Sequence, residues 1–347
     1  MSDAAGSNGG AAVSAAAGTG MRTWIVTQEQ VPALLPMAEC IDAMGEALCA
    51  LARGGAVLPL RTLMWQPDRA GLLGLMPGWL GTPAALGIKV VTVFPGNHGS
   101  DLDAHQGTVQ LFDTTRGSLR AVIDARAVTA IRTAAVSGLA TRLMASADAG
   151  DLAIIGSGVQ AATHVDAMHA VRSLRRVRVW SRTRARAEAF AARHGARTGL
   201  AIEVAASARD AVHGADIVCT TSSAKAPVLE GAWLAPGTHV NAVGACFRDS
   251  RELDTEAVRR ARLIVDRRES ALAEAGDFLM ARAEGAITDD HIAGELGEVV
   301  IGRVVGRAAA DEITLFESLG LAVEDLAAAQ FVYRRAQERG VGCWVEF

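Results

Sequence analysis

The sequence predicts an α/β fold in two domains, one built on a parallel sheet covered by helices and the other of α+β type. Short apolar runs alternate with helical stretches from Asp151 onward, which is typical of a parallel sheet. Between Val57 and Gln110 the pattern changes to β-like runs broken by Gly and Pro, which indicates an antiparallel or mixed sheet. The 347 residues also exceed the about 250–300 residues that a single core usually supports.

The N-terminal half is expected to begin with a short strand at Trp24–Val26. From Val31 to Leu51 apolar residues recur at three- and four-residue steps, which predicts an amphipathic helix. The β-like runs that follow are Leu72–Met76, Ile88–Phe94 and Thr108–Phe112. A long helix is predicted from about Ala127 to Met144, and the short segment after it, 147–150, marks a domain boundary.

The second half is expected to supply the parallel sheet. Leu152–Ile155 predicts a buried strand and Ala161–Val171 a helix, and the pair Val177–Trp180 and Arg184–Arg193 repeats that order. Further short apolar runs are Ile202–Val204, Ile217–Thr220, Val240–Val243 and Leu263–Val265. After Ile287 the pattern becomes helical again.

Composition excludes several classes of protein. Half of the residues are hydrophobic and 21% are charged, which is typical of a folded globular chain rather than a disordered one. No run of about 18 apolar residues occurs, so no membrane partner is expected. The formal net charge is -4 and the basic residues form no stripe, so nucleic acid is not an expected partner.

The cysteines favour a reducing compartment. There are five, at Cys40, Cys49, Cys219, Cys246 and Cys343, with scattered spacing and no C-x-x-C pair. Neither a disulfide framework nor a zinc site is therefore expected, the eight histidines are dispersed, and we predict no metal and a cytoplasmic location. Residues 1–23 are rich in Ala, Gly and Ser without the pattern of a secretory signal, and we expect a disordered tail there.

A glycine-rich turn follows the strand at 152–155 and reads GSGVQA over residues 156–161. In this pattern Gly156 permits a tight turn, Gly158 lets phosphates approach the backbone, and Ala161 lets the helix pack against the strand. Because glycine and alanine are abundant in this chain, the residue pattern alone is weak evidence for a nucleotide site. The prediction rests mainly on the strand that precedes the turn and the helix that follows it. We predict a Rossmann dinucleotide-binding domain, with the pyrophosphate at Gly156, Ser157, Gly158, Val159 and Gln160.

The end of the second strand favours NADP(H) over NAD(H). NAD sites usually place an acid here to bind the ribose 2′-hydroxyl. In this chain Trp180 is followed by Ser181, Arg182 and Thr183, with no carboxylate before Glu188. Hydroxyl and guanidinium groups suit a 2′-phosphate.

Three basic residues lie in mostly apolar or small surroundings: Arg61, Lys89 and Arg132. Each could belong to a solvated face or a structural salt bridge, but three together beside a cofactor domain favour an anionic substrate such as a carboxylate. Lys89 stands out because the 34 basic residues include only one other lysine, Lys225. A lysine is also the basic side chain whose pKa burial changes most readily.

Six segments together resemble the ornithine cyclodeaminase/mu-crystallin family. They are GIKVVTVFPGN (87–97), HQGTVQLFD (105–113), TAIRTAAVSGLAT (129–141), LAIIGSGVQA (152–161), VNAVGACFRDSRELD (240–254) and DEITLFESLGLAVED (311–325). They follow one another in one order with compatible spacing, from about residue 25 to the C-terminus.

The resemblance implies a homodimer of two-domain chains that act on amino or imino acids with NAD(H) or NADP(H). The substrate-binding and dimerisation domain would comprise residues 24–146 and 290–347, the N-terminal half and the C-terminal helices. The Rossmann domain would comprise residues 147–289.

The resemblance also implies roles for individual residues. Arg61 and Arg132 would hold the substrate carboxylate, Met76 would face its side chain, and Lys89 would act as the catalytic group. The remaining cofactor contacts would be Thr133, Thr221, Ser222, Val243, Gly244, Ser318, Leu319 and Gly320.

One departure from the family pattern bears on the reaction. Cyclodeaminases carry an aspartate after the Gly-Ala of the fifth strand, where this chain has Cys246. The sequence therefore predicts an NAD(P)H-dependent imine reductase or amino-acid dehydrogenase acting on a 2-imino carboxylate. An ornithine- or lysine-type cyclodeaminase with bound NAD and a non-catalytic protein that binds NADPH and a small ligand remain alternatives.

Overall fold

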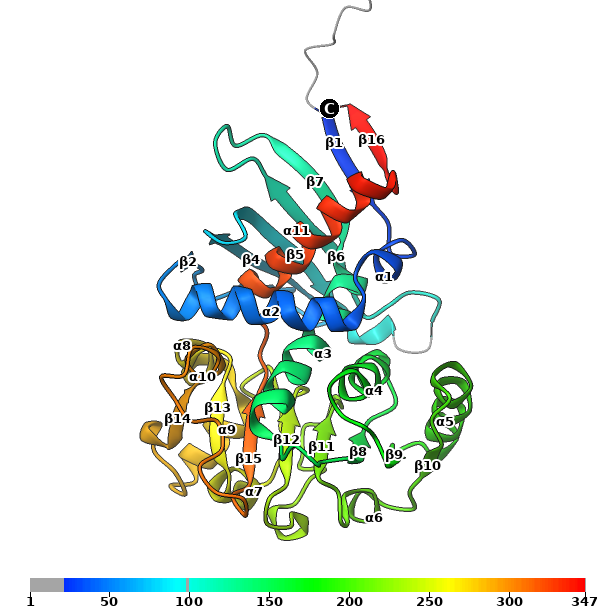
Figure 1. The fold of residues 1–347 in the computed structure, drawn as a ribbon, viewed down its shortest axis with the longest axis vertical. Helices are drawn as coiled ribbons and strands as arrows, with labels where there is room; N and C mark the ends of the chain where they lie inside the picture. Colours follow the sequence, from blue (N-terminus) through cyan, green and yellow to red (C-terminus); the bar gives the residue numbers. More distant parts are fainter. Residues whose placement is uncertain (1–21, 98–99, 347) are drawn as a thin grey trace, which may run out of the picture.

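A computed structural model describes residues 22–97 and 100–346 (Figure 1). It contains two sheets of eight strands each, with helices packed on both, which confirms the predicted α/β class. Of the tail expected at 1–23, residues 1–21 lie outside the described part. Arg22 and Thr23 belong to the first strand, which corrects the tail's expected end.

The first sheet is mixed, with strand order β16-β1-β7-β6-β5-β4-β2, and β3 also pairs with β4. Its strands are β1 (Arg22–Val26), β2 (Ala56–Val57), β3 (Thr62–Trp65), β4 (Leu72–Leu80), β5 (Ala85–Val93), β6 (His105–Phe112), β7 (Leu119–Asp124) and β16 (Cys343–Glu346). Every pairing is antiparallel except that of β1 with β7. The predicted antiparallel or mixed sheet is confirmed.

Side chains alternate between the two faces of this sheet. One face of β4 and β5 is buried beneath helices α2 (Met37–Ala52), α3 (Ala125–Met144) and α11 (Ala322–Arg339). On β4 this face carries the even-numbered residues, such as Met76, and on β5 the odd-numbered residues 85–89, including Lys89. The opposite face keeps apolar side chains that stay partly or fully exposed: Leu75, Pro77, Trp79, Leu86, Ile88 and Val90.

The helix predicted at Val31–Leu51 is interrupted. The structure has α1 (Val31–Leu34) and then α2, with Leu35 and Pro36 between them in extended or irregular backbone. Proline lacks an N–H and disfavours helical dihedrals in the residue before it, so it separates the two helices and precedes the first turn of α2.

The second sheet is parallel throughout, in the order β10-β9-β8-β11-β12-β15-β13-β14. Its strands are β8 (Asp151–Ile155), β9 (Arg176–Trp180), β10 (Ile202–Val204), β11 (Ile217–Thr220), β12 (His239–Ala242), β13 (Arg262–Val265), β14 (Ile292–Glu295) and β15 (Thr314–Glu317). Its helices are α4 (Val159–Val171), α5 (Arg184–Thr198), α6 (Ala208–Val212), α7 (Thr255–Arg260), α8 (Arg268–Glu274), α9 (Gly276–Ala283) and α10 (Leu296–Val300). The first five strands in chain order are arranged 3-2-1-4-5, the order of a Rossmann fold.

The second sheet extends beyond the boundary expected at residue 290. β14 and β15 both belong to it, and β15 lies between β12 and β13. The pattern after Ile287 indicated helix, yet the four residues of β15 are wholly buried and pair on both sides. The chain returns to the first sheet only through Ser318–Leu321, which leads into α11.

The two sheets lie at opposite ends of the molecule, and α3 reaches from the first toward the second (Figure 1). Among the described residues, no helix combines the length and apolar character needed to cross a bilayer. The chain passes between the sheets twice, once after α3 and once at Ser318–Leu321, so the space between them is bordered by residues from both halves.

Gly87 offers a test of the packing between β5 and α11. A Cβ at this position would lie 2.2 Å from the Gln110 carbonyl oxygen and 2.7 Å from Leu326 Cδ2. We expect Gly87→Ala to lower the free energy of unfolding by about 1–3 kcal/mol, measured by chemical denaturation, because the strand must shift to accept the methyl group. Gly96→Ala is the matched control, since no heavy atom lies within 4 Å of its missing Cβ. Equal stability of the two variants would contradict this packing.

Candidate active site

A cleft of ≈ 830 Å³ opens between the two sheets. Its walls are the inner face of β4 and β5, the first turns of α3, the turn between β8 and α4, and the segments that follow β9, β11, β12 and β15. Every residue predicted for the site lines this one cleft: Arg61, Met76, Lys89, Arg132, Thr133, Gly156, Ser157, Gly158, Val159, Gln160, Ser181, Arg182, Thr183, Thr221, Ser222, Val243, Gly244, Ser318, Leu319 and Gly320. The structure thus brings together residues far apart in the chain, while their individual roles stay predictions.

The glycine turn has the shape that a dinucleotide requires. Gly156 has a φ of +135°, and a Cβ there would lie 2.6 Å from Thr221 Oγ1. Gly158 is the N-cap of α4 and provides no side-chain cap, so the first N–H groups of the helix stay available. No heavy atom lies within 4 Å of the missing Gly158 Cβ, which leaves open space at the positive end of the helix dipole. These residues fit the pyrophosphate of a dinucleotide.

The segment after β9 presents polar and cationic side chains to the cleft. The Ser181 hydroxyl accepts a hydrogen bond of 3.0 Å from the hydroxyl of Ser157 in the glycine turn. Arg182 and Thr183, which follow Ser181, also line the cleft. Arg186, one turn into α5, also lines the cleft, and we did not predict it from the sequence. Its spacing of four residues from Arg182 was the available signal. Arg184, between them, instead pairs with Glu188.

Opposite the glycine turn, four charged residues form a buried network. Lys89 Nζ on β5 lies 2.6 Å from Asp325 Oδ2, and Arg132 on α3 donates from Nε to Asp325 Oδ1 at 2.8 Å. Arg132 also donates from Nη1 to Glu324 Oε2 at 2.8 Å. No side chain of the four is more than 5% exposed. Both carboxylates come from the first turn of α11, where they also complement the helix dipole.

Burial shifts the pKa values of Lys89 and Glu324 toward neutrality. Desolvation lowers the pKa of Lys89 to about 8, against the opposing attraction of Asp325. Burial raises the pKa of Glu324 to about 7, against the attraction of Arg132. Lys89 can therefore give up a proton near neutral pH, which an exposed lysine does not do.

The third basic residue, Arg61, precedes β3 and is paired as well. Its Nε donates to Glu274 Oε2 at the end of α8, and its Nη2 donates to the carbonyl oxygen of Cys246 at 3.3 Å. All three basic residues thus have acidic partners that sequence reasoning missed. Glu324 and Asp325 stand in the family-like segment 311–325, which was a usable signal, whereas nothing in the sequence singled out Glu274.

Two further buried acids fix loops that border the cleft. Glu252 accepts hydrogen bonds of 2.6 Å from the backbone N–H groups of both Ser222 and Gly244, and so joins the segments after β11 and β12. Asp266 accepts from the N–H groups of Leu319 and Gly320 at 2.7 and 2.6 Å. Burial raises the pKa of Asp266 to about 6 and raises that of Glu252. Sequence reasoning missed both roles: Glu252 stands in the family-like segment 240–254, which was a usable signal, whereas nothing in the sequence singled out Asp266.

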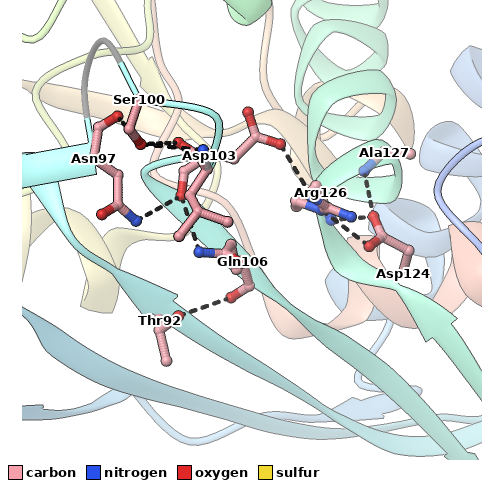
Figure 2. Close-up of polar contacts among 9 residues, drawn as sticks. Thr92, Asn97, Ser100, Asp103, Gln106, Asp124, Arg126 and Ala127 are labelled. Atoms are coloured by element: carbon pink, nitrogen blue, oxygen red, sulfur yellow. Dashed lines mark hydrogen bonds and ion pairs between the residues drawn. The ribbon is translucent and has the colours of Figure 1, made fainter.

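The part of the cleft between the 97–106 segment and the first turn of α3 is lined by polar side chains (Figure 2). Arg126 in the first turn of α3 lies 3.2 Å from Asp103 Oδ2 and 3.1 Å from Asp124 Oδ2. The backbone carbonyl of Asp103 accepts hydrogen bonds of 3.1 Å from the side-chain amides of Asn97 and Gln106. These contacts hold the end of the 100–105 segment beside α3. Within residues 22–97 and 100–346, no three His, Cys, Asp or Glu side chains are placed to hold a metal ion.

Several known proteins are similar to this chain in sequence or in structure. The mouse ketimine reductase mu-crystallin is 43% identical over 280 residues, which cover 81% of this chain and 85% of the relative. The solved structure of Thermococcus litoralis Δ1-pyrroline-2-carboxylate reductase, with NADH and L-proline, has a TM-score of 0.90 and 37% identity and covers 92% of this chain and 99% of that one. An archaeal alanine dehydrogenase dimer with bound NAD has a TM-score of 0.89 and 32% identity over 94% of this chain and 100% of that one.

These similarities extend over both sheets and the cleft between them. Residues 21–340 match the family of ornithine cyclodeaminase and mu-crystallin. The expected resemblance is confirmed, and the chain belongs to the ornithine cyclodeaminase/mu-crystallin family.

Proposed function

We propose that this protein is an NAD(P)H-dependent oxidoreductase that reduces a 2-imino carboxylate to the amino acid, or catalyses the reverse reaction. The observation that carries the proposal is the position of Lys89 and Arg132 in the same cleft as the glycine turn of α4. A cation pair for the substrate and a phosphate site for the cofactor thus share one space. Relatives named for the reduction of ketimines and of pyrroline-2-carboxylate support the same chemistry.

The substrate carboxylate is held by arginine. Arg132 uses Nε and Nη1 for Asp325 and Glu324. Its Nη2 has no hydrogen-bond partner among the described residues and is not fully buried, so it can reach a carboxylate in the cleft. The two acids keep the guanidinium plane in one orientation, and this fixes the C=N bond relative to the nicotinamide site. Arg61 supplies the second guanidinium.

Lys89 is the proton donor. When bound, the reduced nicotinamide supplies a hydride to the imine carbon. The imine nitrogen gains a proton in the same reduction, and the Lys89 ammonium, which forms an ion pair with Asp325, donates that proton. Asp325 then stabilises the lysine during reprotonation from solvent. In the oxidative direction neutral Lys89 accepts the proton from the amine.

The cofactor preference in this proposal is NADP(H). Arg182 in the segment after β9 and Arg186 in the first turn of α5 both line the cleft, and Ser181 and Thr183 add hydroxyl groups. Arginine offers planar donors that match a 2′-phosphate. The two related structures above hold NADH and NAD, so this preference would distinguish the present chain from them.

The proposed assembly is a homodimer. Leu75, Pro77, Trp79 and Ile88 form part of an apolar face on the first sheet that α11 leaves uncovered. Exposed apolar patches of this kind mark interaction surfaces, and a related alanine dehydrogenase is a dimer. In this scheme the first sheet with α2, α3 and α11 is the substrate-binding and dimerisation domain, and the second sheet binds the cofactor.

The proposed location is the cytoplasm. All five cysteines are free, which fits a reducing compartment of this kind.

The decisive experiment is NADPH oxidation measured with cyclic 2-imino carboxylates and with 2-oxo acids, each with and without ammonia or methylamine. Turnover on an imine supports the proposal. Ammonia release from ornithine without added cofactor would instead establish a cyclodeaminase, although Cys246 occupies the position of that activity's aspartate. Tight NADPH binding without turnover across the panel would establish a binding protein.

Replacing Lys89 tests the proton donor. We expect Lys89→Ala to lower kcat at least about 100-fold while the Kd for NADPH, measured by fluorescence, is unchanged. In the wild-type protein the rate of imine reduction should fall as pH rises through about 8, because the ammonium form of Lys89 is lost there. Lys89→Arg should lower kcat as well, because a guanidinium keeps the positive charge but does not release a proton in this pH range. A pH profile that is the same in the wild type and Lys89→Ala would remove Lys89 from the mechanism.

Replacing the two arginines tests the cofactor preference. We expect the double variant Arg182→Ala/Arg186→Ala to lose at least tenfold in kcat/KM for NADPH and to change little with NADH, because only NADPH carries the 2′-phosphate. Arg184→Ala is the control, since Arg184 pairs with Glu188. Equal losses with both cofactors would count against a phosphate site here.

A charge on the open face tests the dimer. Trp79 on β4 is 41% exposed, and we expect Trp79→Arg to shift the mass measured by sedimentation from dimer to monomer. Val305→Arg is the control, because Val305 is 61% exposed and lies outside the first sheet. A dimer that survives Trp79→Arg would locate the interface elsewhere.

A further inference from the structure

We infer that Glu274 occupies Arg61 in place of the substrate carboxylate, and that an imino or amino acid must displace this glutamate in order to bind. The inference rests on the proposed function, which gives Arg61 the role of a carboxylate ligand. It adds a residue that sets how tightly the site binds its substrate and which ligands it admits.

The charges in the cleft favour such a displacement. Lys89, Arg132 and Arg61 are all cationic, yet each is already paired with a carboxylate. A substrate carboxylate that entered this arrangement unchanged would add a negative charge to a site that is already neutralised. One of the protein's own carboxylates must therefore move away or be protonated before the arginines can hold the substrate.

Glu274 is the carboxylate that can move. Glu324 and Asp325 are 0% exposed, and separating them from Lys89 and Arg132 would leave buried charges unpaired. The Arg61–Glu274 pair is at the edge of this group, with side chains 13% and 15% exposed. The Arg61 guanidinium also keeps its hydrogen bond to the Cys246 carbonyl, so it can stay in place when Glu274 leaves.

The local structure favours exchange at this position. Glu274 is the last residue of α8, where the carbonyl end of the helix disfavours a carboxylate. Arg61 is the only cation that pairs with it in the described part of the chain. A small cavity of ≈ 10 Å³, enough for about one water, lies beside the pair, and Arg267 and Ser270 also line it. The Ser270 hydroxyl offers a donor to the displaced carboxylate.

Displacement of this kind also discriminates between ligands. A ligand carboxylate can replace Glu274 on Arg61 because one anion takes the place of another and the guanidinium remains paired. A neutral carboxamide cannot neutralise Arg61, so Glu274 stays in position. Glu274 thus weakens the binding of every anionic ligand by competition and excludes neutral ones from the Arg61 subsite.

Glu274→Gln tests the inference, because glutamine keeps the shape and loses the charge. The probe is pyrrole-2-carboxylate, a planar ring acid without a reducible C=N bond, titrated calorimetrically into the protein saturated with NADPH. We expect its Kd to fall at least tenfold in Glu274→Gln, and the KM for a cyclic 2-imino carboxylate to fall while kcat is unchanged. Any gain in affinity for pyrrole-2-carboxamide should be much smaller, because only the carboxylate neutralises Arg61. Glu256→Gln is the control and should change none of these values, because Glu256 pairs with Arg259 on α7 and lines neither cavity.

An unchanged or higher Kd for pyrrole-2-carboxylate in Glu274→Gln would overturn the inference, since it would show that Glu274 only holds Arg61 in place. Arg61→Gln separates this failure from failure of the proposed function. Loss of affinity in Arg61→Gln, without a gain in Glu274→Gln, rejects the competition alone. Unchanged affinity in Arg61→Gln rejects the carboxylate role of Arg61 itself. In the Arg61→Gln background, Glu274→Gln should have no further effect.

Discussion

The buried network of Lys89, Arg132, Glu324 and Asp325 is the constraint around which the substrate side of the cleft is built. Its members come from β5, α3 and α11, and their ion pairs fix these three elements relative to one another. Removing one partner from a buried group of this kind leaves an uncompensated charge and typically costs about 3–5 kcal/mol. The same pairing that stabilises the fold therefore determines where the ammonium and the guanidinium lie.

Elsewhere in the cleft, buried carboxylates are paired with backbone N–H groups instead of with cationic side chains. Glu252 and Asp266 are buried carboxylates, and they accept hydrogen bonds from main-chain N–H groups of the loops after β11, β12 and β15. These loops lie at the carboxyl ends of parallel strands, where open α/β sheets bind their ligands. The residues that follow these strands are thereby held at fixed positions along the cleft.

Local patterns were sufficient for some of this organisation and insufficient for the rest. The strands from β8 to β12, the helices α4 and α5 and the turn at Gly156 were predictable, because apolar runs and turn residues act over a few positions. The placement of β15 between β12 and β13, and the pairing of β16 with β1, depend on contacts between distant segments that no local pattern encodes. The same holds for the acidic partners of the three basic residues: 193 positions separate Arg132 from Asp325.

The register of β5 has a consequence for a part of the chain far from the cleft. Along this strand Lys89 points toward α11, while Ile88 points to the uncovered face. A slip of one residue would exchange the two faces and place an isoleucine where the ammonium now lies. The turn at 81–84, which joins β4 to β5, helps to set that register through its length. An insertion or deletion of a single residue in this surface turn would thus be a change to the chemistry of the site, although no atom of the turn borders it.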